Sequence, residues 1–116
     1  MKVNEHVLLV ARQQAMHRVI ARRIRKSPAL LDIPRDNLKR WMKMDLEQAG
    51  RVSALWLEWD RILRTRSVEE ILEILESDDP KFERLQHGSP FAGILSQEEV
   101  MSFHKKKKRE HQPVPA

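Results

Sequence analysis

Residues 84–99 read RLQHGSPFAGILSQEE, and this stretch decides how the chain can fold. It holds Gly88 and Gly93, two of the three glycines, and the Ser89–Pro90 pair interrupts the helical pattern. Three apolar residues then follow within five positions: Phe91, Ile94 and Leu95. A solvent-exposed loop does not usually carry so many large apolar side chains. We therefore predict a structured turn that packs on the helices before it.

Each part of this motif has an expected structural role. Gly88 is expected to end the preceding helix in the left-handed conformation, and Gly93 to permit a tight turn. Pro90 fixes the backbone, Phe91 fills the core, and Leu95 packs against the helix that follows. The structural motif that we assign consists of Gly88, Ser89, Pro90, Phe91, Gly93 and Leu95.

Outward from this stretch, capping signals and helical spacing of apolar residues predict helices almost everywhere. A first helix is expected to run to about Lys26 and to be stopped by Ser27–Pro28, followed by a single turn at residues 29–31. Later helices are expected to be capped by Asp32, Ser53, Ser67, Asp79 and Ser96. No alternation typical of strands persists. The prediction is an all-α fold of five or six short helices in one compact domain, residues 1–103, with a basic C-terminal tail.

The spacing also predicts which faces are buried. The first helix is expected to bury the stripe Leu8, Ala11, Ala15 and Val19, with Val7, Ile20 and Ile24 beside it. The second is expected to bury Leu38, Trp41, Met42 and Leu46. The third carries the most voluminous apolar face, formed by Leu55, Trp56, Trp59, Ile62 and Leu63.

Composition narrows the class of protein. The chain of 116 residues is long enough to bury a core, and no apolar run approaches the roughly 20 residues needed to cross a bilayer. It has no cysteine, which removes disulfides, thiol catalysis and cysteine-based zinc sites. We expect a protein of the cytoplasm with no membrane association.

Charge is unevenly distributed along the chain. Residues 1–51 carry 12 Lys or Arg against 5 Asp or Glu, residues 52–103 carry 5 against 11, and residues 104–116 carry 5 against 1. This asymmetry fits contact with nucleic acid, an acidic protein partner, or pairing between the chain's own helices.

No catalytic set is apparent. The five histidines lack the i, i+4 spacing of a helical metal pair, and the acidic residues from Glu69 to Asp79 fit a solvated helix face. Ser89 lacks a nucleophile-elbow pattern, and neither Gly88 nor Gly93 begins a phosphate-binding loop. We expect no enzyme, no metal and no cofactor.

Basic residues are the remaining functional signal. Seven of them are predicted to form a nucleic-acid-binding face across the first two helices: Arg18, Arg22, Arg25, Lys26, Arg35, Lys39 and Lys43. The two helices could imitate a helix-turn-helix, but Pro28 and Pro34 stand where a tight turn with Gly is usual. The tail over residues 104–116 is expected to be disordered. Its partner-binding candidates, Lys105, Lys106, Lys107, Lys108 and Arg109, are equally typical of a solvated tail.

Residues 59–63, 68–75, 84–85 and 89–99 together resemble a family of small helical bacterial proteins with a Ser-Pro-Phe-Ala-Gly signature. The resemblance covers roughly residues 59–99 and implies an antitoxin-like partner of a toxin encoded by a neighbouring gene. The long lysine tail departs from that pattern. The leading hypothesis is therefore a protein-binding antitoxin, and the alternative is a DNA- or RNA-binding regulator. A scaffold protein and an oligomer also stay open.

Overall fold

A computed structural model of the chain describes residues 5–103 and shows an all-α fold. Its elements are α1 (Glu5–Lys26), η1 (Pro28–Leu31), α2 (Asp32–Ala49), α3 (Ala54–Thr65), α4 (Val68–Glu76), η2 (Pro80–Phe82) and α5 (Glu83–His87). A further helix occupies residues 97–103. The predicted fold class is thus confirmed. The predictions for the basic tail and for Lys105 to Arg109 lie outside the described residues.

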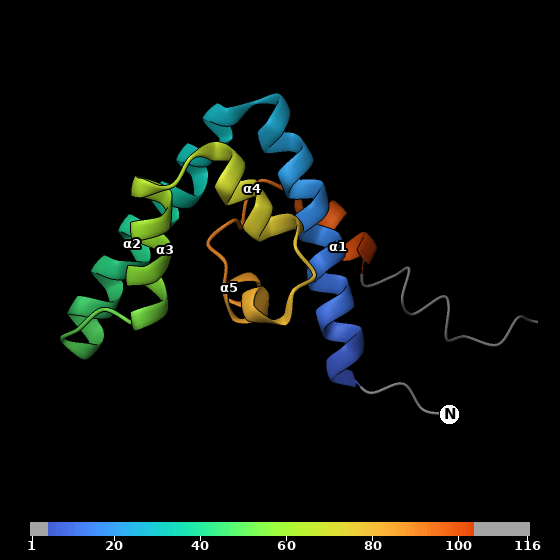
Figure 1. Cartoon of the computed structure of the whole chain (residues 1–116). Helices are drawn as coiled ribbons and strands as arrows, with labels where there is room; N and C mark the ends of the chain where they lie inside the picture. Colours follow the sequence, from blue (N-terminus) through green and yellow to red (C-terminus); the bar gives the residue numbers. More distant parts are fainter. Residues whose placement is uncertain (1–4, 104–116) are drawn as a thin grey trace, which may run out of the picture.

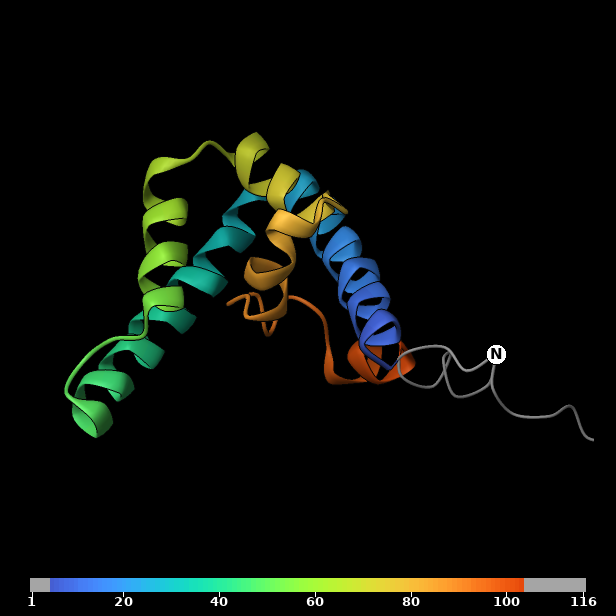
Figure 2. The same ribbon diagram turned by 60° about the horizontal axis from the view of Figure 1, so that its bottom comes forward.

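The helices form an arch (Figure 1). α1 and α2 diverge from the corner at η1, α3 runs back beside α2, and α4 returns to pack on α1. α5 lies under the arch and contacts α1 and α4. Figure 2 shows that the α2–α3 hairpin stands to one side and that the helix over residues 97–103 lies beside α1.

Serine and aspartate caps start these helices as the sequence predicts. Ser53 accepts from the backbone of Trp56, and Ser67 forms a complete capping box with Glu70. Asp79 caps the 3₁₀ turn η2. Asp32 is different, because η1 runs directly into α2 and the Asp32 backbone N–H already donates to Ala29 and Leu30. Asp32 is therefore the C-cap of η1 and the first residue of α2, and the prediction that it is the N-cap of α2 is wrong, since that position is Leu31.

Trp59 of α3 is the centre of the core. It is fully buried, and its ring meets that of Phe91 edge-on at a centroid distance of 5.3 Å. Its indole Nε1–H donates to the carbonyl of Leu85 at 3.0 Å. Burial of two aromatic rings supplies much of the apolar area that stabilises a small domain. Trp59 thus joins α3, α5 and the segment after α5.

Two predicted buried faces differ from those in the structure. α1 buries His17, Ile20, Ala21 and Ile24, so the burial predicted for Ile20 and Ile24 is confirmed. The predicted main stripe is wrong, because Ala11 is exposed and Leu8, Ala15 and Val19 are only half-buried. At 100° per residue, the buried stripe lies on nearly the opposite side of α1 from the predicted one. Because the polar His17 lies in the middle of this buried face, the spacing of apolar residues alone did not indicate it. On α2, Leu38 is buried and Trp41 and Met42 are half-buried, but Leu46 is 55% exposed.

Gly88 is not a left-handed terminator, since its φ is −107°. A Cβ there would lie 2.2 Å from Cδ2 of the half-buried Leu55, so the Leu55 side chain would have to shift to admit it. The left-handed glycines are Gly93, with φ of 101° in the predicted turn, and Gly50, with φ of 73° at the end of α2.

We expect Gly88→Ala to lower the free energy of unfolding by about 1 kcal/mol, the low end of overpacking costs, because the half-buried Leu55 side chain must shift. In a double-mutant cycle measured by chemical denaturation, Leu55→Ala should remove most of that cost, since it deletes the atom that clashes. Gly50→Ala is the matched control. It has no neighbour within 4 Å, so its cost of about 1–2 kcal/mol is backbone strain and should add to that of Leu55→Ala. Additive behaviour of Gly88→Ala with Leu55→Ala would contradict the close-approach explanation.

Candidate functional site

The segment over residues 88–96, called here the anchored loop, is irregular in backbone yet largely buried. Asn37 of α2 supports its first half. The amide nitrogen of Asn37 donates to the carbonyls of Pro90 at 2.9 Å and Ala92 at 2.8 Å, and the side chain is 5% exposed. Arg40 donates to the Asn37 amide oxygen, which fixes the orientation of that amide. Two backbone acceptors of the loop thereby find partners away from water.

His17 of α1 holds the start of the loop and is 3% exposed. Its Nδ1 lies 2.6 Å from the carbonyl oxygen of Gln13, which can only accept, so Nδ1 carries the proton. Its Nε2 therefore accepts from the hydroxyl of Ser89, whose Oγ lies 2.6 Å away. Burial lowers the pKa of His17, and the hydrogen bond to Gln13 opposes this effect more weakly. The ring is neutral at pH 7.

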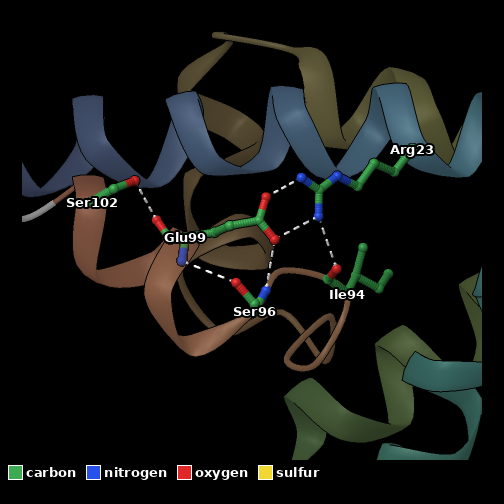
Figure 3. Close-up of polar contacts among 5 residues, drawn as sticks. All are labelled: Arg23, Ile94, Ser96, Glu99 and Ser102. Carbon is green, nitrogen blue, oxygen red and sulfur yellow. Dashed lines mark hydrogen bonds and ion pairs between the residues drawn. The ribbon is translucent and has the colours of Figure 1, made fainter.

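Arg23 of α1 holds the end of the loop (Figure 3). Its guanidinium binds both carboxylate oxygens of Glu99 and also donates to the carbonyl of Ile94 at 3.2 Å. Glu99 and Ser96 complete the predicted second capping box, with N–O distances of 2.9 and 3.1 Å. The hydrogen bonds from Arg23, and then from the Ser96 backbone, lower the pKa of Glu99 to about 2. One guanidinium thus joins α1, the loop and the last described helix.

The sequence-predicted basic residues fall into two groups. Arg25 pairs with Glu76 at 2.8 Å, and Arg35 pairs with Asp32 at 3.4 Å and donates to the carbonyl of Leu63. The other five of the seven predicted residues are exposed and have no carboxylate within 4.0 Å among the described residues: Arg18, Arg22, Lys26, Lys39 and Lys43. Part of the charge asymmetry is therefore pairing between the chain's own helices.

The structure does not gather the five unpaired cations into one cluster. Arg18, Arg22 and Lys26 recur at steps of four along α1, and Lys39 and Lys43 along α2, so each set lies on one helical stripe. Because α1 and α2 diverge from η1, the two stripes lie on two separate sides of the arch (Figure 1).

The tip of the α2–α3 hairpin, residues 41–57, is called here the arm. Trp41 and Trp56 lie between its helices with ring centroids 4.9 Å apart, and both are only half-buried. Three further apolar side chains are about half exposed: Met44 at 48%, Leu46 at 55% and Leu57 at 52%. The carboxylate of Asp45 accepts from the backbone N–H of Ser53 at 3.0 Å and closes the hairpin. The arm is thus an ordered, partly apolar surface.

Acidic side chains of α4 face solvent or internal partners. Glu70 belongs to the Ser67 capping box, and Glu76 binds Arg25. Within residues 5–103 no three His, Cys, Asp or Glu side chains come close enough to hold a metal ion. No helix in this part of the chain combines the length and apolarity needed to span a membrane.

Comparison of the chain with protein-family models, with curated proteins and with solved structures found no match. The resemblance of residues 59–99 to antitoxin-like proteins therefore stays a prediction.

Two residues that organise the anchored loop, Arg23 and Asn37, were assigned no role from the sequence. For His17 the sequence left a structural and a solvated role open, and the structure shows the structural one, with a partner that the sequence did not indicate. The one available signal was their position. His17 shares a helical stripe with Ile20, Ala21 and Ile24, and Asn37 directly precedes Leu38, so a polar residue on such a stripe needs a partner from elsewhere in the chain.

The pKa of His17 is lower in the folded chain than the unfolded value of 6.5, so the unfolded chain binds more protons near that pH. The free energy of unfolding should therefore be highest above about pH 6.5 and fall as the pH drops below it. His17→Gln should cost about 1–3 kcal/mol at pH 7.5 and should flatten this decline. Urea denaturation at several values between pH 5 and 8 measures both effects. His87→Gln, at an exposed histidine, is the matched control and should keep the decline. An unchanged pH profile in His17→Gln would contradict the assignment.

Proposed function

We propose that the chain is a non-enzymatic protein-binding module, the antitoxin of a bacterial toxin–antitoxin pair that neutralises its toxin by direct binding. The observation that carries the proposal is the arm. It presents tryptophan, methionine and leucine side chains at the tip of a hairpin, and the arm is braced mainly by its own two helices (Figures 1 and 2). The resemblance of residues 59–99 supports the choice of a toxin as the partner.

The chemistry of the arm is that of a protein interface. Interface centres are enriched in Trp, Met and Arg, and exposed apolar side chains gain free energy when a partner covers them. The Trp41–Trp56 contact already orders two large side chains, so binding loses little further side-chain entropy there. Pre-ordered aromatic residues of this kind favour recognition of a partner.

Charge around the arm indicates the character of the partner. Lys43 and Leu46 lie close together on the outer side of α2, and Lys39 continues the same stripe toward the corner. These two lysines have no carboxylate partner among the described residues. A protein surface with an apolar centre and acidic residues beside it would complement both features.

Co-expression with the protein encoded by the neighbouring gene should give a complex that copurifies and should restore growth. The variants Met44→Glu and Leu46→Glu should weaken copurification at least tenfold, because each places a carboxylate in the apolar interface. Both side chains are about half exposed, so the variants should fold.

Met101→Glu is the matched control, since Met101 is 46% exposed on the helix over residues 97–103, away from the arm. It should behave as the unchanged chain. Absence of any complex would refute the antitoxin proposal, and a complex insensitive to both arm variants would refute the assigned surface.

A second candidate function is binding of DNA or RNA, and it is favoured by the five unpaired cations. Cations that have no internal partner are available to phosphates, and each phosphate contact releases counterions. The two stripes on α1 and α2 would then contact separate parts of a nucleic acid, because the two helices diverge.

Binding to duplex DNA, measured by fluorescence anisotropy across a salt series, tests this candidate. The double variant Arg22→Gln/Lys39→Gln should reduce the slope of log K against log salt by about 1–2. Arg61→Gln/Arg66→Gln removes the same charge from α3 and its end, outside the two stripes, and should leave the slope near that of the unchanged chain. No retention on DNA at low salt, or equal effects of the two double variants, would exclude the proposed stripes.

A further inference from the structure

A pocket of about 190 Å³ lies where α1, the anchored loop and the helix over residues 97–103 meet. Its wall is mainly apolar and comes from Met16, Ile20, Phe91, Leu95 and Val100. Beside these side chains the wall includes Ala92 and Gly93, which are too small to fill the space. None of the residues that line it belongs to the arm or to the basic stripes.

One polar pair, His17 and Ser89, forms part of this wall. The proton on Nδ1 of His17 is held by the Gln13 carbonyl, so Nε2 can only accept, and the Ser89 hydroxyl proton points to it. The Ser89 hydroxyl proton is thus already donated to His17, while Oγ of Ser89 can still accept a hydrogen bond. The pocket thus combines an apolar wall with a hydroxyl oxygen that can accept a hydrogen bond but has no free proton to donate.

We propose that this pocket is a binding site for a small, neutral, ring-sized apolar molecule with one hydrogen-bond donor, the chemical class of phenol. The volume sets the size, because an apolar cavity of about 150 Å³ is sufficient to bind benzene. The Ser89 oxygen sets the polarity, because a hydroxyl on the ring would donate to it. The His17–Ser89 pair offers an anion neither a positive charge nor a free hydrogen-bond donor, since His17 is neutral and its only ring proton is already donated to Gln13.

Such a ligand would touch α1, the anchored loop and the last described helix at once, and would stabilise their packing by mass action. The site goes beyond the proposed function, because it lies outside the arm and needs no protein partner. Binding and copurification can therefore fail or succeed independently.

NMR titration of the full isotope-labelled chain with phenol and, separately, with benzene tests the proposal. Both should give saturable shifts centred on residues 16–20 and 89–100, with dissociation constants on the order of 1 mM for ligands of this size. Ser89→Cys should weaken phenol binding about fivefold or more relative to benzene, since it keeps a donor for Nε2 of His17 but replaces the hydroxyl oxygen with a weakly accepting sulfur.

Val100→Phe is a second variant that does not depend on Ser89. Val100 is half-buried, and the larger ring should fill the pocket and abolish the shifts from both probes while the chain stays folded. Shifts that do not saturate, or that persist in Val100→Phe, would overturn the site. An equal change of phenol and benzene binding in a folded Ser89→Cys chain would overturn the assigned ligand class. If Ser89→Cys does not fold, benzene binding and its loss in Val100→Phe decide the question of the site.

Discussion

A buried segment without regular secondary structure must find partners for its backbone polar groups outside itself, and this constraint governs the fold. The anchored loop places Pro90 and Phe91 in the core, and its carbonyls at Pro90, Ala92 and Ile94 lie in buried or part-buried positions outside any helix. Asn37 bonds two of those carbonyls and Arg23 a third, while His17 holds the hydroxyl of Ser89. An unmade hydrogen bond at any of these sites would cost about 1–3 kcal/mol, a large part of the stability of a small domain.

These anchors connect distant parts of the chain. Asn37 bonds residues 53 and 55 positions away, and Arg23 bonds Glu99 from 76 positions away. The first two helices therefore cannot complete their buried faces until the C-terminal half has folded onto them. A chain of short helices ordinarily forms mostly local contacts, but here the decisive polar contacts are non-local and are expected to form late.

The sequence allowed the fold class and most helix starts to be predicted, because capping is local: Ser53, Ser67 and Asp79 each bond a backbone group two or three residues away. On the core face of α1, Ile20 and Ile24 were predicted, but His17 was not, since the partner of its buried Nε2 is Ser89, 72 positions away. Gly88 was predicted to have a left-handed conformation, whereas its φ is −107° and a Cβ there would meet the Leu55 side chain, which only the packing of α3 reveals. In the candidate sites, the sequence allowed the basic residues themselves to be identified. It did not show that they divide between two helices that diverge.

The helix over residues 97–103 lies alongside α1, so the described chain starts and stops on the same flank of the arch, away from the tip of the arm (Figures 1 and 2). The described part of the molecule therefore has two opposite extremities, one where α1 begins and the helix over residues 97–103 lies, and one at residues 50–53. The turn over residues 50–53 is largely exposed, and loop tips of this kind tolerate insertions, so an added segment there would project away from the buried core.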